Sequence, residues 1–183
     1  MDEGRIILSG VPFQLVIDRL CYQLIETYDR FENTCFVAIQ TGGVPLVDRI
    51  VKRLGAIQPG SNFEYGKLDI TFYRDDFRTR SKPLKASTTE MEFLVEGKNV
   101  ILVDDVLYTG RAVQAALTAL NHYGRPKEVS LLSLVDRRFN RHLPIQSDYI
   151  GITIDAFAEA YVRVDWQEAT GEDRILLFAN SPA

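Results

Sequence analysis

The chain has 183 residues, of which 46% are hydrophobic and 25% are charged, so we expect one globular domain with a single core. Its formal net charge of -4 excludes a general electrostatic attraction to nucleic acid or to an anionic membrane. No stretch approaches the roughly 18 consecutive apolar residues of a membrane span, and the N-terminal apolar run is too short for a signal peptide. These features predict a cytoplasmic protein without a membrane partner.

The first third of the chain predicts a helix, a buried strand and a second helix. Apolar residues recur at three- and four-residue intervals over about residues 12–28, which is the pattern of an amphipathic helix. The apolar run at residues 34–40 is typical of a strand covered on both faces, and a pair of glycines ends it. A second helical pattern covers residues 46–54, so this region predicts the first half of a parallel βαβ unit.

The rest of the chain predicts more strands and one more helix. Residues 67–73 have the β-branched and aromatic content of a strand, whereas residues 74–89 show no regular pattern. Residues 99–103 predict a third buried strand, residues 111–123 a helix and residues 129–136 a fourth strand. The remainder, up to residues 174–178, is rich in strand-like segments. We therefore predict an α/β fold, a doubly wound sheet with a smaller β-rich region in the tail.

Cysteines and histidines do not predict a metal centre. Cys21 and Cys35 lie in apolar surroundings without the spacing of metal ligands, so we expect buried free thiols. His122 and His142 are too few and too far apart to suggest a metal site.

The stretch VILVDDVLYTGRA, residues 100–112, places two carboxylates at the end of a predicted buried strand. In an open α/β sheet, ligands bind at the carboxyl ends of the strands, so Asp104 and Asp105 occupy a functional position. The following residues, 106–110, lead into a helix N-terminus, where unpaired N–H groups and the helix dipole favour a phosphate. Thr109 adds a hydroxyl donor, and Gly110 allows close approach of the backbone.

A single ligand that contacts both parts must carry hydroxyl groups or a bound cation about one sugar width from its phosphate, because carboxylates repel phosphate. A ribose 5-phosphate meets this requirement. The simpler alternative is that Thr109 caps a helix and an aspartate is only solvated at a strand end. The chain has neither the GxxxxGK[ST] motif of P-loop proteins nor the GxGxxG motif of dinucleotide-binding proteins. A response-regulator receiver domain would carry its acidic pair near the start of the domain, unlike this chain.

The same stretch resembles the phosphoribosyl-diphosphate (PRPP) binding motif of type I phosphoribosyltransferases. The chain is most similar to the pyrimidine operon attenuator and uracil phosphoribosyltransferase family. The similarity runs through AIQTGGVPL, LDITFYRDD, FLVEGKNVILVDDVLYTGRAVQAAL, YGRPKEVSLLSLVDR, LPIQSDYIG and GEDRI, which is nearly the whole chain. It implies the type I phosphoribosyltransferase fold, a central parallel sheet flanked by helices with a small β-rich hood. In one domain, the core would cover about residues 10–140, the hood and C-terminal strands about 141–180, and a mobile loop about 74–89.

The resemblance implies roles for individual residues. Asp104 and Asp105 would be catalytic: they would hold the ribose hydroxyl groups, stabilise positive charge on the ribose carbon, and contact Mg²⁺ only indirectly, through these hydroxyls or water. The implied site for PRPP and its 5-phosphate consists of Val106, Leu107, Tyr108, Thr109, Gly110 and Arg111.

Three more segments have implied roles. The pyrophosphate loop would be Gln40, Thr41, Gly42 and Gly43, and the mobile loop would close over the pyrophosphate with Arg74, Arg78 and Arg80. Asp136 and Arg137 would line the base or pyrophosphate side. From the residues alone, the mobile loop equally fits a solvated charged hairpin, and Asp136 with Arg137 equally fits an ion pair at a strand end.

The chain departs from the family pattern at the leaving-group and base sites. The pyrophosphate loop of the family usually reads Lys-Thr-Arg-Gly, whereas this chain has Gln40 and Gly42 at the two charged positions. We therefore expect weaker PRPP binding or slower chemistry, although N–H groups of a glycine turn can still bind phosphate oxygens. Ala112 stands where the family commonly has a threonine. Residues 151–162 lack the Lys-Asn-x-Pro-Thr-Ser of the family hood, so uracil is inferred from overall similarity.

Positions that contact RNA in regulatory members are also altered. Asp18 and Tyr22 replace a threonine and a histidine, and Gln146 and Ile152 replace basic residues, whereas Arg19 and Arg141 are kept. A carboxylate on an RNA-binding face repels phosphate, so the sequence argues against RNA as a partner.

We therefore expect an enzyme that transfers phosphoribose from PRPP to uracil, with Mg²⁺ bound alongside PRPP, and that forms UMP and pyrophosphate for pyrimidine salvage. Its partners would be these small molecules and further copies of the chain, in a homodimer or higher homo-oligomer. The alternatives are a UMP- or PRPP-responsive RNA-binding regulator of a pyrimidine operon, a PRPP-binding protein that has lost pyrophosphate chemistry, and a purine phosphoribosyltransferase on the same scaffold.

Overall fold

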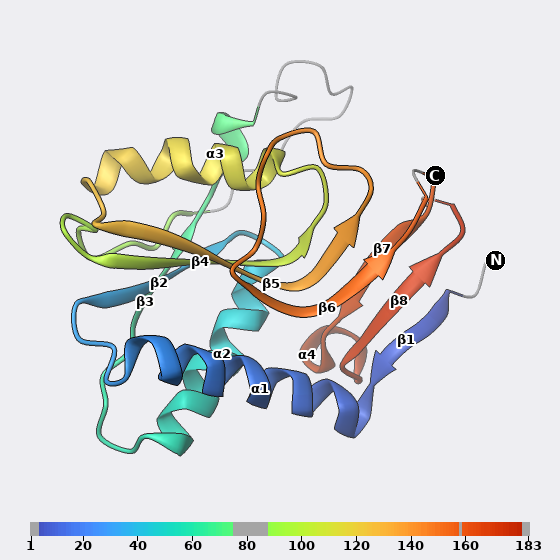
Figure 1. Ribbon diagram of the computed structural model, residues 1–183, viewed down its shortest axis with the longest axis horizontal. Helices are drawn as coiled ribbons and strands as arrows, with labels where there is room; N and C mark the ends of the chain where they lie inside the picture. Colours follow the sequence, from blue (N-terminus) through green and yellow to red (C-terminus); the bar gives the residue numbers. More distant parts are fainter. Residues whose placement is uncertain (1–3, 75–87, 158, 181–183) are drawn as a thin grey trace.

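A parallel five-stranded sheet forms the centre of the structure (Figure 1). The computed structural model describes residues 4–74, 88–157 and 159–180. The strands lie in the order β3-β2-β4-β5-β6, and all neighbours are parallel. They span Thr34–Ile39 (β2), Glu64–Leu68 (β3), Asn99–Leu107 (β4), Glu128–Arg138 (β5) and Tyr149–Asp155 (β6).

Helices cover both faces of this sheet. The helices α1 (Gly10–Tyr28) and α2 (Gly43–Ile57) lie on one face, and α3 (Arg111–Leu120) lies on the other (Figure 1). Two short 3-10 helices, η1 (Thr71–Tyr73) and η2 (Asn121–Tyr123), follow β3 and α3. The doubly wound α/β sheet predicted from the sequence is confirmed.

Alternation of side chains along the strands builds one hydrophobic core on each face. Val100 and Leu102 of β4 belong to the core under α3, whereas Ile101 and Val103 belong to the core under α1 and α2. All four side chains are fully buried. Burial on both faces explains why residues 100–103 are an uninterrupted apolar run, which ends at the first carboxylate.

The two cysteines lie in different cores. Cys21 packs in the core under α1 and α2, and Cys35 packs in the core under α3. Both are free, as expected from the sequence, and desolvation by burial raises the pKa of each thiol to about 12. Within the described ranges, none of the helices is long and apolar enough to span a membrane.

A small antiparallel sheet forms the hood. Its strands lie in the order β1-β8-β7, and the short helix α4 (Gln167–Thr170) joins β7 to β8. The strands span Arg5–Ser9 (β1), Tyr161–Asp165 (β7) and Arg174–Phe178 (β8). The N-terminal strand β1 was not predicted, and β6, which lies in the region 141–180 predicted for the hood and C-terminal strands, belongs to the large sheet. Pairing of β1 with β8 is a contact between the two ends of the chain, which local patterns do not encode.

A buried ion pair joins the hood to α2. Asp173 is 9% exposed and accepts hydrogen bonds from Arg49 Nη2 at 2.6 Å, from Gln14 Nε2 at 3.2 Å and from the N–H of Gln167 at 2.8 Å. The Arg49 guanidinium also lies 4.6 Å from the centroid of the Trp166 ring. This cluster fixes the position of the hood relative to the large sheet.

Two predicted segments differ from the structure. Residues 67–73 are not one strand, because the Asp69 carboxylate accepts hydrogen bonds from both the N–H and the hydroxyl of Thr71 and turns the chain into η1. The strand predicted at residues 99–103 continues to Leu107, because its ladder with β5 continues past Asp104 to Val106 and beyond. The aspartates and the two residues after them are therefore part of β4, not of the following loop.

Candidate active site

The acidic pair lies in the last part of β4, beyond the apolar segment of the strand. Asp104 is only 7% exposed, and its Oδ1 accepts a hydrogen bond from the N–H of Asp105 at 3.1 Å. Adjacent residues of a strand point to opposite faces of the sheet. Asp104 therefore follows Val100 and Leu102 toward the α3 side, and Asp105 follows the residues that face α1 and α2.

Contacts of the two carboxylates agree with this alternation. The Asp105 carboxylate lies directly against Gly42, and it fills the space that a Cβ at position 42 would need. Asp104 instead experiences the positive charge of Arg74, which follows η1. The two carboxylates thus face different surroundings, and a ligand that contacts both must lie beyond the end of β2, whose ladder with β4 stops at Val103.

Burial raises the pKa of both carboxyl groups above the ordinary range of aspartate. For Asp104 the negative charge of Asp105 raises it further, while the N–H of Asp105 and the charge of Arg74 oppose the increase. Ionisation of each carboxyl group therefore costs more free energy here than it would for an aspartate in water. Hydroxyl donors or a cation at this position would restore the ionised form.

The pyrophosphate loop, residues 40–43, lies next to the acidic pair. It connects β2 to α2, a non-proline cis peptide joins Gln40 to Thr41, and Gly43 is the first residue of the helix. Gln40 donates from Nε2 to the carbonyl oxygen of Thr88 at 2.7 Å. A Cβ at Gly43 would overlap the carbonyl oxygen of Val103. The glycines therefore let this loop approach β4 more closely than any other residue would.

The predicted 5-phosphate site is divided between a strand and a loop. Val106 and Leu107 pair with β5 in the ladder, and Leu107 is 1% exposed, so its side chain belongs to the core under α3. Only residues 108–111, which we call the phosphate loop, follow the strand, and Arg111 is already the first residue of α3. Gly110 has a φ of +89°, a conformation that favours glycine, and Thr109 Oγ1 accepts a hydrogen bond from the N–H of Arg111 at 3.4 Å.

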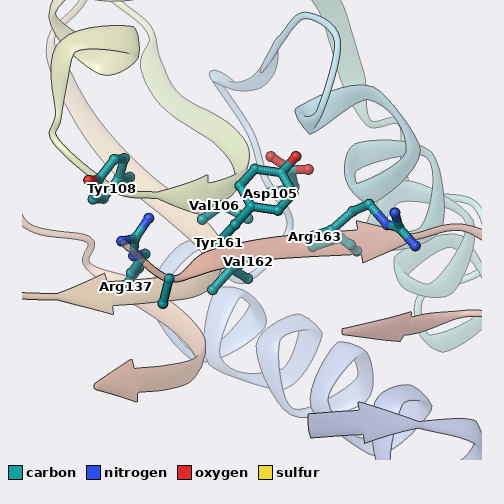
Figure 2. A pocket seen from close by; sticks show the side chains of 9 residues that line it. Asp105, Val106, Tyr108, Arg137, Tyr161, Val162 and Arg163 are labelled. Atoms are coloured by element: carbon teal, nitrogen blue, oxygen red, sulfur yellow. The ribbon is translucent and has the colours of Figure 1, made fainter. Parts of the chain in front are cut away.

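A cavity of about 580 Å³ opens between the end of β4 and the hood. Its lining comes from β4, the phosphate loop, β5, and β7 with the residue before it, and consists of Asp105, Val106, Tyr108, Arg137, Ala160, Tyr161, Val162, Arg163 and Val164. Figure 2 shows Tyr108 and Arg137 toward one end of this cavity, with Asp105 and Arg163 toward the other. The sequence did not single out β7, because its alternation indicates a strand and carries no chemical motif.

Arg137 links the phosphate loop to the segment between β6 and β7. It is 4% exposed, its guanidinium carbon lies 3.8 Å from the centroid of the Tyr108 ring, and its Nη2 donates to the carbonyl oxygen of Phe157 at 2.8 Å. Asp136 does not line the cavity. Adjacent residues of a strand point to opposite faces, so Asp136 points away from the cavity that Arg137 faces, and its carboxylate accepts a hydrogen bond from Arg141 Nη2 at 2.6 Å. Of the two residues predicted for the base side, the cavity thus contains Arg137.

The predicted mobile loop is only partly described. Arg74 is half-buried, and its positive charge opposes the increase that burial causes in the pKa of Asp104. Arg78 and Arg80 lie outside the described residues. The role of this loop remains a prediction.

The acidic pair fits Mg²⁺ in its donor chemistry. Mg²⁺ prefers oxygen ligands and usually binds through one or two carboxylates together with substrate oxygens and water. In the parts of the chain that the structure describes, no group of three or more acidic, histidine or cysteine side chains could hold a metal by itself. An ion at Asp104 and Asp105 would therefore need oxygens from a ligand.

The sequence of this chain is similar to those of known proteins over nearly its whole length. Residues 5–169 match the model of the "Phosphoribosyl transferase domain" family. Proteins named "Bifunctional protein PyrR" from Bacillus mycoides (strain KBAB4) and Bacillus cereus (strain B4264) are each 40% identical over 182 residues, covering 97% of this chain and 99% of theirs.

Solved structures show the same fold at low sequence identity. A hypoxanthine phosphoribosyltransferase from Staphylococcus aureus has a TM-score of 0.69 and 17% identity, covering 99% of this chain and 94% of its own. The hypoxanthine phosphoribosyl transferase of Trypanosoma cruzi has a TM-score of 0.70 and 15% identity, covering 97% and 92%. The chain therefore belongs to the phosphoribosyl transferase domain family and, within it, to the group of PyrR proteins.

Proposed function

We propose that this protein transfers phosphoribose from PRPP to uracil in the cytoplasm and forms UMP and pyrophosphate. The observation that carries the proposal is that the pyrophosphate loop lies against the buried acidic pair, while Asp105 and Tyr108 of the phosphate loop line the same cavity under the hood. Membership of the phosphoribosyl transferase family and 40% identity with PyrR proteins support it.

Different residues of the chain would bind different parts of PRPP. The phosphate loop binds the 5-phosphate through its N–H groups, and Asp104 and Asp105 hold the ribose hydroxyls beside the carbon that becomes cationic. The bond from this carbon to the pyrophosphate oxygen breaks, and a bond to a ring nitrogen of uracil forms as that nitrogen loses its proton. Mg²⁺, bound with PRPP near the acidic pair, would neutralise charge on the departing pyrophosphate.

The pyrophosphate loop would work without charged side chains. Gln40 and Gly42 replace the lysine and arginine of the resembling family, so backbone N–H groups and Mg²⁺ must carry the interaction with the leaving group. We therefore expect measurable but slow turnover. The mobile loop with Arg78 and Arg80 would supply further positive charge on closing, and replacing both by alanine should weaken PRPP binding.

A panel assay tests both the reaction and the base. Purified protein with PRPP and Mg²⁺ is supplied with uracil, hypoxanthine, guanine, xanthine or orotate, and pyrophosphate and nucleotide are quantified. We expect UMP to be the main product and its formation to collapse in Asp105→Asn. Product from a purine instead would replace uracil as the substrate. PRPP binding without turnover of any base would refute the enzymatic proposal and favour a PRPP-binding protein.

A second candidate function is regulation through RNA, which the similarity to proteins named as bifunctional favours. Several side chains at the relevant positions are engaged within this chain. Asp18 pairs with Arg53 at 2.7 and 3.0 Å, and Arg19 donates to the carbonyl oxygens of Ile150 and Gly151. We propose that RNA binding is absent, because the pair of Asp18 with Arg53 offers no net positive charge to a phosphate and the Arg19 guanidinium already has acceptors within the chain.

Filter binding to a pyrimidine leader transcript, with and without UMP, tests this second candidate. We expect only weak binding that disappears at moderate salt. Specific binding that resists salt and responds to UMP would establish the regulatory function instead. We also propose a homodimer or higher homo-oligomer, which light scattering on the purified protein tests.

A further inference from the structure

Residues 141–145, which we call the outer segment, run along the phosphate loop. Arg141 donates from Nη1 to the carbonyl oxygen of Tyr108, and the backbone N–H of His142 donates to the carbonyl oxygen of Thr109 at 3.0 Å. Two consecutive carbonyl groups of the phosphate loop are thus bound by the outer segment.

The outer segment also contacts the remaining two residues of the phosphate loop. A Cβ at Gly110 would lie 3.3 Å from Ile145 Cδ1 and 3.5 Å from Leu143 Cβ, so these side chains pack against the glycine. Arg111 Nε donates to His142 Nδ1 at 3.3 Å. Each residue of the loop therefore has a partner in a segment about thirty positions later, and the loop does not depend on its own turn alone for its shape.

The carbonyl contacts determine where the N–H groups of the loop point. A trans peptide unit is planar, with its C=O and N–H directed to opposite sides. Because the carbonyls of Tyr108 and Thr109 face the outer segment, the N–H groups of Thr109 and Gly110 face away from it. A phosphate bound by the loop needs N–H groups on that side.

Arg141 is itself held in place. Its Nη2 donates to Asp136 Oδ1 at 2.6 Å, and the side chains of Arg141 and Asp136 are 22% and 12% exposed. Asp136 belongs to β5 and is paired in the ladder with Leu107, the last residue of β4. The planar guanidinium therefore bridges a rigid strand and the first carbonyl of the phosphate loop, a contact that uses two donors in a fixed geometry.

We propose that Arg141, oriented by Asp136, is a positioning residue for binding of the PRPP 5-phosphate. It holds the Tyr108–Thr109 peptide unit so that the N–H of Thr109 is available to the phosphate, and it does not itself contact the substrate. This inference rests on the proposed function, and it gives Arg141 and Asp136 a role in the phosphate site in place of the RNA or base contacts that the resemblance implied.

The test compares two ligands that would occupy different ends of the site. Calorimetry measures the Kd of ribose 5-phosphate, which requires the phosphate loop, and the Kd of pyrophosphate with Mg²⁺, which requires the pyrophosphate loop. We expect Arg141→Ala to weaken ribose 5-phosphate binding about tenfold or more and to leave pyrophosphate binding within about twofold. The KM for PRPP should rise accordingly, while the KM for uracil stays nearly constant.

Two conservative variants separate positioning from folding. Arg141→Lys keeps the charge but lacks the planar fork, so it should recover only part of the ribose 5-phosphate affinity. Asp136→Asn preserves side-chain volume and Arg141 itself, and it should weaken the same ligand about threefold by loosening the guanidinium. Arg138→Ala is the matched control, because Arg138 lies on the same strand, pairs with the exposed Asp155 and makes none of the contacts of the outer segment described above.

The outcomes distinguish the inference from the proposed function. Wild-type protein that binds neither PRPP nor ribose 5-phosphate would overturn both. If wild type binds ribose 5-phosphate and Arg141→Ala binds it with the same Kd, the positioning role alone is overturned. The same holds if Arg141→Ala loses affinity equally for ribose 5-phosphate and pyrophosphate. If Arg141→Ala does not fold, the same comparison in Asp136→Asn decides.

Discussion

The two glycines of the pyrophosphate loop, Gly42 and Gly43, lie against different kinds of atom. A Cβ at Gly43 would overlap a backbone carbonyl of β4, whereas a Cβ at Gly42 would overlap only the carboxylate of Asp105. The backbone cannot move without disturbing the sheet, but the carboxylate can rotate. The two adjacent glycines should therefore respond differently to the same substitution.

We expect Gly43→Ala to lower the free energy of unfolding by about 2–3 kcal/mol, in the range for overpacking of a rigid site. Gly42→Ala should cost less than about 1 kcal/mol yet strongly reduce turnover, since Asp105 must leave its position. Gly55→Ala in α2, where no atom lies within 4 Å of the new Cβ, is the control and should raise stability by about 0.5–1 kcal/mol. Urea unfolding and the UMP assay measure these effects; equal losses of stability for Gly42 and Gly43 would contradict the distinction.

The raised pKa of the Asp104 carboxyl predicts that the free energy of unfolding depends on pH. Between its unfolded and folded pKa values, this carboxyl binds more protons in the folded state, so its contribution to stability falls as pH rises through that interval. Asp104→Asn removes this loss but keeps an acceptor for the N–H of Asp105. The variant should therefore gain stability relative to wild type as pH rises above the ordinary pKa range of aspartate, because the wild-type carboxyl must then ionise in a buried position.

Thermal unfolding of wild type and Asp104→Asn, from within the ordinary pKa range of aspartate to above it, measures the difference. A variant whose stability relative to wild type does not rise over this interval would contradict the prediction. PRPP with Mg²⁺ should raise the Tm of wild type and not that of the variant, because a ligand stabilises only the state that binds it.

At the scale of elements, the hood depends on its attachment to α2. Asp173 is buried and accepts two hydrogen bonds from Arg49, one from Gln14 and one from the N–H of Gln167, so removing the guanidinium leaves a poorly compensated charge. We expect Arg49→Ala to cost about 3 kcal/mol of unfolding free energy. The exposed pair of Arg138 and Asp155 is the control, and breaking it should cost less than about 1 kcal/mol.

A double-mutant cycle of Arg49→Ala with Asp173→Asn, measured by urea unfolding, isolates the interaction between them. Coupling close to zero would mean that the pair does not hold the hood. Loss of this attachment should also raise the KM for uracil more than the KM for PRPP, because β7 lines the cavity on the hood side.

For the whole molecule, the two thiols report on unfolding from opposite faces of the sheet. Cys21 and Cys35 are fully buried in separate cores, and each has a pKa of about 12. We expect neither to react with a thiol reagent in the native protein, because both burial and the thiol form protect them. In denaturant, equal labelling rates would show that the two cores open together, whereas faster labelling of Cys35 would show that the α3 side opens first.

The sequence by itself determined the parts of this protein that local patterns encode. The helices, the strands buried on both faces and the aspartates followed by a phosphate loop are all visible as periodicity or as a contiguous motif, because burial on a helix or strand repeats along the chain. The sequence also located the glycine loop between β2 and α2, although without the reason for its two glycines. The strand after Lys67 and the end of β4 were placed wrongly, since a side-chain turn and a sheet ladder decide them.

Only the tertiary structure decided which distant residues meet. It placed Asp105 on Gly42, the hood strand β7 across the cavity from β4, and Arg141 on the carbonyl of Tyr108. It also separated Asp136 from Arg137 by turning them to opposite faces of β5. These contacts depend on how whole elements pack against each other, and residues so far apart in the chain share no local pattern from which their proximity could be read.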